Sequence, residues 1–328
     1  MERRGDFTEE ARGFMKSRVI LTGAELDFFT RIDRRPSSAE EIAGEMGLDP
    51  RATARVLDCL TAYGLLRKEN GRYNLTFESA TFSSLHPETV LPMLLHMNGL
   101  WDRWSRLTGI LRKEPCAPQD PGLKMDEENR KAFIGAMHVV GRGLSREIAG
   151  SVDLARVRRL LDIGGGSGTY IIAFLSKNPG MRGVIFDLEN VIPMARERLE
   201  SEGFLDRVDL VAGDFYRDEL PKGCDAALLS AIIHQNSPKE NEELYAKIYR
   251  ALDPGGILLI RDHIMDESRT CPAAGAVFAL NMLVNTRGGD TYTFREVKES
   301  LERVGFPAVR LLRSGERMDS IVEAQKPA

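Results

Sequence analysis

A glycine-rich loop separates an apolar stretch from a helical pattern in LLDIGGGSGTYIIAFL, residues 160–175. Gly164, Gly165 and Gly166 have no side chain, so the backbone there can turn tightly and approach a ligand closely. The helix that follows offers free backbone N–H groups to polar ligand atoms. A glycine turn after a strand is common, so the meaning of the loop depends on the residues that accompany it.

Acidic residues end the next two apolar stretches. Asp187, followed by Leu188, comes about twenty residues after the loop, where an acidic side chain binds ribose hydroxyls in nucleotide-binding sheets. In VAGDFY, Gly213 and Asp214 are placed to hydrogen-bond an adenine amino group, with Phe215 as an apolar wall. Either acid alone could cap a helix or a turn. Features at the ends of three successive strands favour a nucleoside site, since ligands of open α/β sheets bind there.

Asp162 stands directly before the glycines and distinguishes between two kinds of nucleotide. A carboxylate is unfavourable beside a pyrophosphate and favourable beside an ammonium group. The dinucleotide fingerprint also requires glycine or alanine at position 169, where this chain has Thr169. The pattern therefore predicts a ligand that carries a ribose and an amino-acid tail.

Two histidines follow central strands at the same edge of the predicted sheet. His234 ends SAIIH, and His263 follows Asp262 in IRDHIMDE. Either histidine could act as a general base there, or could position a substrate or serve the structure. Because neighbouring strand residues point to opposite faces, at most one of Asp262 and His263 is expected to face the pocket. Asn281 and Asn285 share one face of an apolar helix, either as core hydrogen-bonding groups or as substrate contacts.

The elements that position these residues form two patterns. From residue 157 onward apolar strands alternate with helices, which predicts a mostly parallel sheet with helices on both faces. Residues 37–76 have the pattern of a winged helix-turn-helix, with Asn70-Gly71 as the turn of a hairpin. Between them, apolar stripes over 90–111 and 133–148 predict two long helices that face a core, separated by a Pro-rich break at 114–122. The strands are RRLLDIG, GVIFDL, VDLVAG, CDAALLSAII and GILLIRD, completed by GFPAVRLLRS and DSIVEAQ.

The composition is ordinary for a soluble globular protein. The 328 residues carry a net charge of −4, which gives no reason to expect nucleic acid or a membrane as the main partner. No apolar run reaches the roughly 18 residues of a membrane span, and the N-terminus lacks the apolar part of a signal peptide. The four cysteines form no CxxC pair. A cytoplasmic protein without a metal site is expected.

The motifs DIGGGSGTY, FDLENVIPMA, GDFY, LLSAIIH and ALDPGGILLIRD together resemble the class I S-adenosylmethionine-dependent methyltransferases. More narrowly, they resemble the small-molecule O-methyltransferases of the acetylserotonin, caffeic-acid and bacterial polyketide type. The resemblance implies a Rossmann-like domain with a mostly parallel seven-stranded sheet after an N-terminal all-helical winged-helix dimerisation domain. It also implies S-adenosyl-L-methionine as cofactor, S-adenosyl-L-homocysteine as product, and a homodimer joined through the N-terminal helices. The expected parts are a dimerisation domain over 1–85, a helical connector and pocket roof over 86–150, and a cofactor-binding domain over 151–328.

The same resemblance suggests roles for further residues. It places Ser230 beside the adenine, and it places Met137 and His138 on the helix that roofs the substrate pocket. His234 matches the first histidine of the family's HDWSDEH stretch, and Glu240 stands where the catalytic histidine is expected six residues later. The family also has a second acidic residue near the C-terminus, and Thr291 occupies the corresponding position in this chain. The resemblance thus supports the cofactor and leaves open whether a general base is used.

Three functions remain under consideration. The first is methyl transfer to a hydroxyl of a small molecule, aromatic ones included. The second is a relative that binds the cofactor and methylates carbon or nitrogen, or performs chemistry other than methyl transfer. The third is a winged-helix regulator that binds DNA, for which residues 51–73 supply only a modest basic patch.

Overall fold

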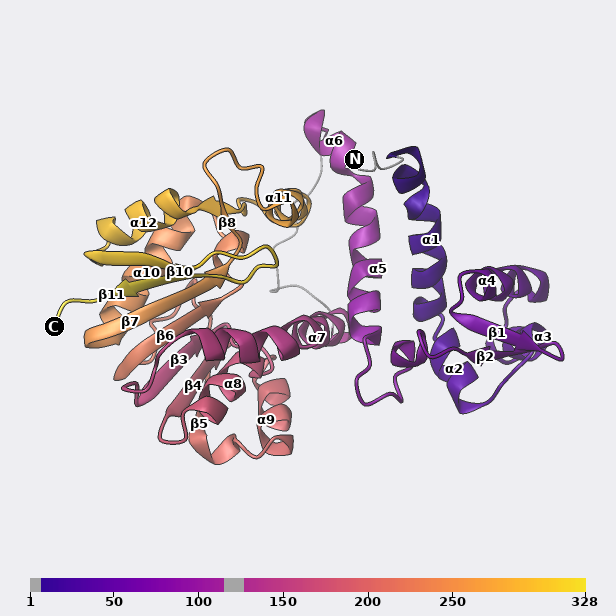
Figure 1. Cartoon of the computed structure of the whole chain (residues 1–328), viewed down its shortest axis with the longest axis horizontal. Helices are drawn as coiled ribbons and strands as arrows, with labels where there is room; N and C mark the ends of the chain where they lie inside the picture. Colours follow the sequence, from indigo (N-terminus) through magenta and orange to yellow (C-terminus); the bar gives the residue numbers. More distant parts are fainter. Residues whose placement is uncertain (1–6, 115–126) are drawn as a thin grey trace, which may run out of the picture. The chain divides into compact units, whose positions relative to one another are not determined.

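The computed structural model describes residues 7–114 and 127–328, and divides into two compact units (Figure 1). One unit comprises Met1–Asp102 with Asp126–Val139, and the other comprises Arg103–Met125 with Val140–Ala328. Most of the Pro-rich break predicted at 114–122 lies outside the described residues. The three-part division inferred from the sequence stays a prediction.

The N-terminal unit is a bundle of short helices with one hairpin. A reciprocal capping box between Ser38 and Glu41 begins α3, and Asn70 and Gly71, both with positive φ, form the hairpin turn. Phe28, Leu57 and Tyr73 are fully buried in its core. The structure confirms the winged-helix pattern, a helical domain that carries the predicted hairpin. The elements are α1 (Phe7–Glu25), α2 (Phe28–Arg34), α3 (Ala39–Met46), α4 (Pro50–Ala62), β1 (Leu66–Glu69), β2 (Arg72–Leu75), η1 (Ala80–Phe82) and α5 (Leu91–Ser105).

The two apolar stripes are less buried than their periodicity predicts. The first is not one helix, since α5 ends at Ser105 and a separate α6 spans Leu107–Leu111. No residue of α5 is fully buried, and Met97 is 47% exposed. The second stripe lies on α7 (Glu127–Ser151), where Leu144 and Ile148 are buried while Val140 is exposed. Amphipathic spacing specifies which face is apolar but not whether the same chain covers it.

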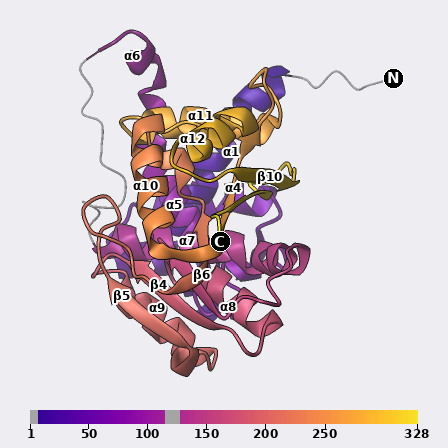
Figure 2. The ribbon, with the colours of Figure 1, turned by 90° about the vertical axis from the view of Figure 1, so that its left-hand side faces the viewer.

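The second unit contains a seven-stranded sheet in the order β10-β11-β7-β6-β3-β4-β5 (Figures 1 and 2). The strands from β7 to β5 are parallel, and β11 is antiparallel to both of its neighbours. This confirms the predicted mostly parallel sheet. The strands are β3 (Arg159–Ile163), β4 (Arg182–Asp187), β5 (Val208–Ala212), β6 (Cys224–Ser230), β7 (Leu252–Asp262), β10 (Ala308–Arg313) and β11 (Ser320–Gln325), with a short pair β8 (Ile264–Met265) and β9 (Tyr292–Thr293).

Helices cover both faces of this sheet, and the alternation of strand residues sorts side chains between them. Leu258 and Ile260 of β7 enter the core formed with α10 and α12. Leu259 enters the core formed with α7, α8 and α9. Arg261 and Asp262 therefore leave the end of β7 on opposite faces. The helices are α8 (Thr169–Lys177), α9 (Ile192–Ser201), α10 (Pro238–Ala251), α11 (Ala273–Asn285) and α12 (Phe294–Arg303), with 3₁₀ turns η2 (Leu205–Arg207) and η3 (Ile233–Gln235).

Candidate active site

The glycine loop folds against the ends of the neighbouring strands. Gly164, Gly166 and Gly168 all have positive φ, a conformation that favours glycine. A Cβ added to Gly164 would lie 2.7 Å from Cδ1 of Ile232, just beyond β6. The backbone N–H of Gly166 donates to Oδ2 of Asp187 at 2.8 Å. The structure thus joins the loop to the acid that the spacing singled out.

Asp187 is held by backbone groups at the end of β4. Its Oδ1 accepts the N–H of Leu188 at 2.7 Å. Burial raises the pKa of Asp187, and the N–H groups of Gly166 and Leu188 act in the opposite direction. Each carboxylate oxygen has a second lone pair, so hydroxyl donors can still bind.

The end of β5 brings the third group of predicted residues to the loop. Oδ1 of Asp214 accepts the N–H of Tyr216 at 2.9 Å. A Cβ on Gly213 would lie 2.4 Å from the buried ring of Phe186. Cε1 of Phe215 lies 3.6 Å from the position that a Cβ would take on Gly164. The loop and the ends of β4, β5 and β6 therefore form one site.

Asp162 and Ser230 direct polar atoms to the α8 face of the sheet at its carboxyl edge. Asp162 is 1% exposed, and neither its Oδ2 nor the buried hydroxyl of Ser230 has a hydrogen-bond partner. Burial, with the nearby charge of Asp187 second, raises the pKa of Asp162 to about 7. A Cβ on Gly165 would lie 2.9 Å from Oδ2 of Asp162, so a larger residue there would crowd the carboxylate. These atoms suit the ammonium group of an amino-acid tail.

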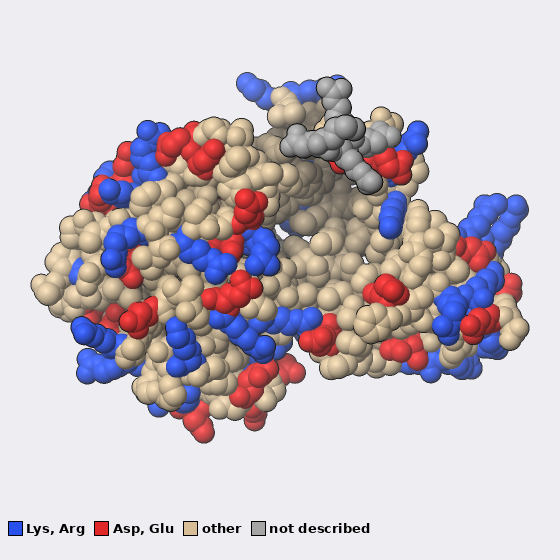
Figure 3. All heavy atoms as spheres, in the orientation of Figure 1, with Lys and Arg blue, Asp and Glu red and all other residues tan. Residues whose placement is uncertain are grey.

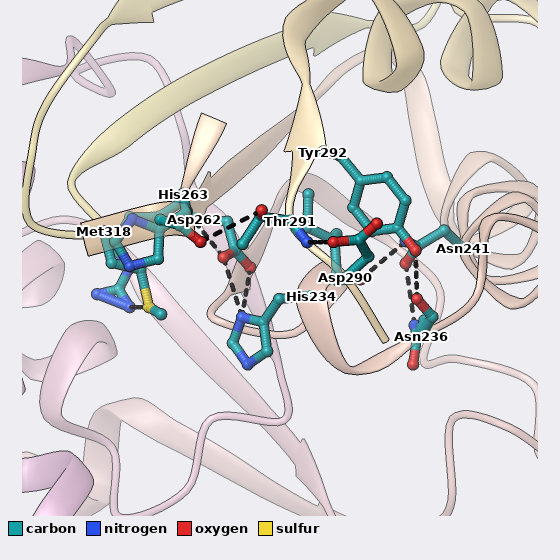
Figure 4. A network of polar contacts seen from close by, with 12 residues as sticks. His234, Asn236, Asn241, Asp262, His263, Asp290, Thr291, Tyr292 and Met318 are labelled. Carbon is teal, nitrogen blue, oxygen red and sulfur yellow. Dashed lines mark hydrogen bonds and ion pairs between the residues drawn. The ribbon is translucent and has the colours of Figure 1, made fainter. Parts of the chain in front are cut away.

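His234 is paired with Asp262 (Figure 4). Nδ1 of His234 lies 2.9 Å from both oxygens of Asp262, which is fully buried. Burial acts to raise the pKa of Asp262, but its interaction and hydrogen bond with His234, together with the charge of Arg261 and the N–H of His263, outweigh burial, and the pKa is lowered. An ionised Asp262 must accept, so Nδ1 carries the proton. Nε2 of His234 then has a free lone pair, with no partner among the residues that the structure describes.

A polar network fixes the backbone on which His234 stands. The strand expected over CDAALLSAII ends at Ser230, because Ala231 has a φ of 58° and His234 belongs to the turn η3. The carbonyl of His234 accepts the N–H of Asp290 at 2.9 Å. Figure 4 shows the continuation of the network through Asn236, Asn241 and Tyr292. In it Asn241 donates to the Ile233 carbonyl at 2.8 Å, Asn236 donates to Asn241 at 3.0 Å, and the Tyr292 hydroxyl donates to the Asn236 carbonyl.

The imidazole ring of His263 lies beside this pair without bonding to it, although the backbone N–H of His263 donates to Oδ1 of Asp262 at 2.8 Å. Burial lowers the pKa of His263, and its Nδ1 has no hydrogen-bond partner. The ring of Phe278 on α11 contacts both histidines, at centroid distances of 4.8 Å to His234 and 5.2 Å to His263. A neutral His263 next to an aromatic ring fits a wall of the pocket better than a second base.

Two positions inferred from family resemblance have side chains that bond to groups other than the His234 ring. Glu240 is exposed and forms the capping box of α10, accepting the N–H of Ser237 at 2.7 Å. Glu240 thus stabilises a helix start in this structure, and its match to the family's catalytic position stays an inference from the resemblance. The hydroxyl of Thr291 donates to the carbonyl of Gly275 at 3.4 Å. Asp262 is the acid that contacts His234.

The four remaining pocket candidates fall into two pairs. Asn285 accepts from Arg103 at 2.7 Å, and Asn281 accepts from the Trp104 indole at 3.0 Å. Asn285 also donates to Oδ1 of Asn281 at 3.0 Å, so the structure favours the interpretation of both asparagines as hydrogen-bonding groups that hold Arg103 and Trp104. The other pair, Met137 and His138, belongs to the N-terminal unit, and its role at the pocket stays a prediction.

The pairing of His234 with Asp262 is a contact at the candidate site that the sequence left unrecognised. The two residues are 28 positions apart and meet because β6 and β7 are neighbours. A usable signal was present, since Asp262 ends β7 and His234 follows β6 at the same edge of the sheet. Among the described residues, no group of three or more His, Cys, Asp or Glu is arranged to hold a metal ion. None of the helices in the described ranges has the length and apolar content of a membrane span.

Comparisons with known proteins agree with this site. Residues 122–307 match the O-methyltransferase domain family and residues 8–84 match the O-methyltransferase dimerisation domain. A 3-hydroxy-5-methyl-1-naphthoate 3-O-methyltransferase of Streptomyces sahachiroi is 32% identical over 93% of this chain and 90% of its own. The tetracenomycin polyketide synthesis 8-O-methyl transferase of Streptomyces glaucescens is 31% identical over 93% and 92%. The structure of human N-acetylserotonin methyltransferase in complex with SAM shares the fold, with a TM-score of 0.83, 24% identity and full coverage of both chains. The chain belongs to the family of small-molecule O-methyltransferases that use S-adenosylmethionine and carry an N-terminal dimerisation domain.

Proposed function

We propose that His234 is the general base of the methyl transfer and that Asp262 orients it. The observation that carries this proposal is the 2.9 Å contact between Nδ1 of His234 and the buried carboxylate of Asp262. S-adenosylmethionine supplies an electrophilic methyl group when it is bound. Nε2 of His234 can accept the proton that the acceptor hydroxyl loses as it becomes a nucleophile. Asp262 then stabilises the imidazolium ion that forms.

The residues at the strand ends fit the cofactor. We assign the ribose hydroxyls to Asp187, with Leu188 against the adenine. We assign the adenine amino group to Asp214, and the ammonium group to Asp162. The buried unpartnered oxygens of Asp162 and Ser230 support this assignment, because such atoms normally find a partner. We assign the remaining contacts with the cofactor to the ring of Phe215 and to the backbone of Gly164, Gly165, Gly166 and Gly213.

An aromatic hydroxyl is the acceptor that the pocket favours. A phenol has a pKa of about 10, so a base that removes its proton at neutral pH accelerates the transfer. Phe278 and the neutral His263 supply flat surfaces beside His234. The two Streptomyces relatives act, by their names, on a hydroxylated naphthoate and on a tetracenomycin polyketide.

A homodimer joined through the N-terminal helices is also proposed, in the cytoplasm. The match of residues 8–84 to a dimerisation domain supports it. Large apolar side chains of α1 and α5 are exposed in the single chain, including Phe14 at 57% and Met97 at 47%. Burial of such side chains in a partner would recover hydrophobic free energy.

The structure weakens the DNA-binding alternative. Basic side chains of the hairpin are paired with acids, Lys68 with Asp58 at 2.7 Å and Arg67 with Glu69 at 2.8 Å. On the face drawn in Figure 3, basic and acidic side chains are interspersed. Phosphate binding usually relies on a group of unpaired basic side chains.

The function is tested with purified protein, S-adenosylmethionine and a panel of hydroxylated naphthoates, anthraquinones and indoles. We expect equimolar S-adenosylhomocysteine and an O-methylated product, identified by mass spectrometry and by the carbon shift of the new methyl group in NMR. A product methylated at carbon or nitrogen would contradict the proposed chemistry. Release of S-adenosylhomocysteine without a methylated product would favour a relative with other chemistry.

Cofactor binding should depend on pH through Asp162. The ammonium group favours the ionised carboxylate, so binding to a group of pKa about 7 must expel a proton at lower pH. Affinity for S-adenosylhomocysteine is expected to rise with pH up to about 7, and to fall below it by up to about tenfold per unit. The charged and titratable groups that face Asp162 are Asp187, Arg261 and Tyr170. Calorimetry from pH 5.5 to 8.5 tests this, and Asp162→Asn should flatten the dependence; a flat wild-type curve contradicts the assignment.

A further inference from the structure

Buried polar atoms without a partner gather at the carboxyl edge of the sheet. Four such atoms are Asp162 Oδ2, Ser230 Oγ, Arg261 Nε and His263 Nδ1. Asp162, Ser230 and Arg261 end the adjacent strands β3, β6 and β7. Their neighbours Leu160, Leu228 and Leu259 all enter the core under α7, α8 and α9, so the three polar side chains share that face. Unpartnered buried polar atoms are costly, and their concentration here points to a polar ligand.

Arg261 is unusual among them because it is a buried cation. It is 4% exposed, and within the described ranges no carboxylate lies within ion-pair distance of it. Its guanidinium donates to the Tyr170 hydroxyl at 2.5 Å and contacts the Met318 sulfur at 3.4 Å. The nearby Asp319 is already paired with Arg313 at 2.6 Å. Buried arginines are normally matched by an anion, and the Tyr170 hydroxyl is a neutral partner.

Opposite charges therefore flank Ser230 on one face. β6 lies between β3 and β7, so Asp162 and Arg261 are separated by two strand spacings, about 10 Å between backbones. Ser230 is in register with Arg261 across β6 and β7. A zwitterionic α-amino-acid group can place its ammonium toward the acid and its carboxylate toward the arginine. The guanidinium group is suited to a carboxylate because of its planar array of donors.

We propose that Arg261 binds the carboxylate of the cofactor's amino-acid tail, opposite Asp162, with Ser230 as a second donor in place of the position beside the adenine that the family resemblance implies for it. This rests on the proposed function, in which the cofactor tail lies at these strand ends. The acceptor substrate is a less suitable partner, because Asp262 and His234 lie on the α10 face and Arg261 leaves β7 on the other. Arg261 is thus a positioning residue for the cofactor and not part of the proton transfer.

Two ligands separate this role from a structural one. S-adenosylhomocysteine carries the amino-acid group, whereas 5′-methylthioadenosine shares its adenosine and thioether and lacks that group. Calorimetry is performed with wild type, Arg261→Met and the matched control Arg313→Met. We expect Arg261→Met to lower the affinity for S-adenosylhomocysteine by about 10- to 100-fold and the affinity for 5′-methylthioadenosine by less than about twofold. Arg313→Met should leave both affinities within about twofold, because Arg313 is already paired with Asp319.

The opposite results are equally distinct. If Arg261→Met lowers the affinity for both ligands equally, its role is structural and the inference is overturned. Unchanged affinities for both ligands would overturn it as well. If Arg261→Met does not fold, Arg261→Lys takes its place, and an unchanged ratio of the two affinities contradicts the proposal. A wild-type protein that binds neither ligand would instead overturn the proposed function itself.

Discussion

Replacement of His234 by glutamine is expected to lower kcat/KM for a phenolic substrate by about 100- to 10,000-fold. Glutamine keeps a polar side chain beside Asp262, which is 2.9 Å from Nδ1 of His234 in the wild type, but it cannot accept a proton at neutral pH. Affinity for S-adenosylhomocysteine should stay within about twofold, because Asp162, Ser230 and the glycine loop are unchanged. Steady-state kinetics and calorimetry measure the two effects separately.

Glu240→Gln is the matched control for this variant. Glu240 lies in the same stretch of sequence, but its carboxylate caps α10 and is exposed. Activity of Glu240→Gln should remain within about twofold of wild type, as for other exposed positions. The loss in His234→Gln should shrink for substrates whose hydroxyl is more acidic, since these need less help from a base. If His234→Gln retains a tenth or more of the activity on an ordinary phenol, the assignment of His234 as base is wrong.

The arrangement of the glycine loop and the strand ends was predictable because its signals are local, and their contacts with the cofactor stay a proposal. The glycines before α8 and the acid after β4 are set by backbone requirements that short motifs record. The parallel arrangement of the strands places their carboxyl ends at one edge of the sheet. This arrangement brings Asp187, Asp214 and Phe215 to the loop. The hydrogen bond from the N–H of Gly166 to Asp187 joins the two residues that the spacing singled out.

The acceptor side depends on contacts between segments far apart in the chain, and a motif does not contain them. SAIIHQNSPKE carries a histidine and a glutamate within a few residues, and its sequence does not show which of the two contacts another functional group. The structure separates them: Ala231 ends β6 with a positive φ, η3 turns His234 toward Asp262, and Ser237 with Glu240 begins α10. The same limit applies to the stripe on α5, whose period shows an apolar face but not what covers it.

Asp262→Asn is expected to reduce kcat by about 1,000- to 10,000-fold while it preserves the size of the side chain. An asparagine amide can donate to Nδ1, which would favour the tautomer that carries its proton on Nε2. That tautomer cannot accept the hydroxyl proton of the substrate. The imidazolium ion would also lose the buried negative charge that now lies 2.9 Å from Nδ1. The NMR shifts of the two His234 nitrogens report the tautomer directly, independently of activity.

The double variant His234→Gln/Asp262→Asn decides whether the two residues act as a unit. If Asp262 works only through His234, the double variant should be about as slow as His234→Gln alone, because the contribution of Asp262 is already lost. Additive losses would show that Asp262 has a separate role, for example in holding the backbone of His263, whose N–H donates to Oδ1 of Asp262 at 2.8 Å. Affinity for S-adenosylhomocysteine is measured in parallel, since a general collapse of the strand ends would weaken it and a specific loss of the base would not.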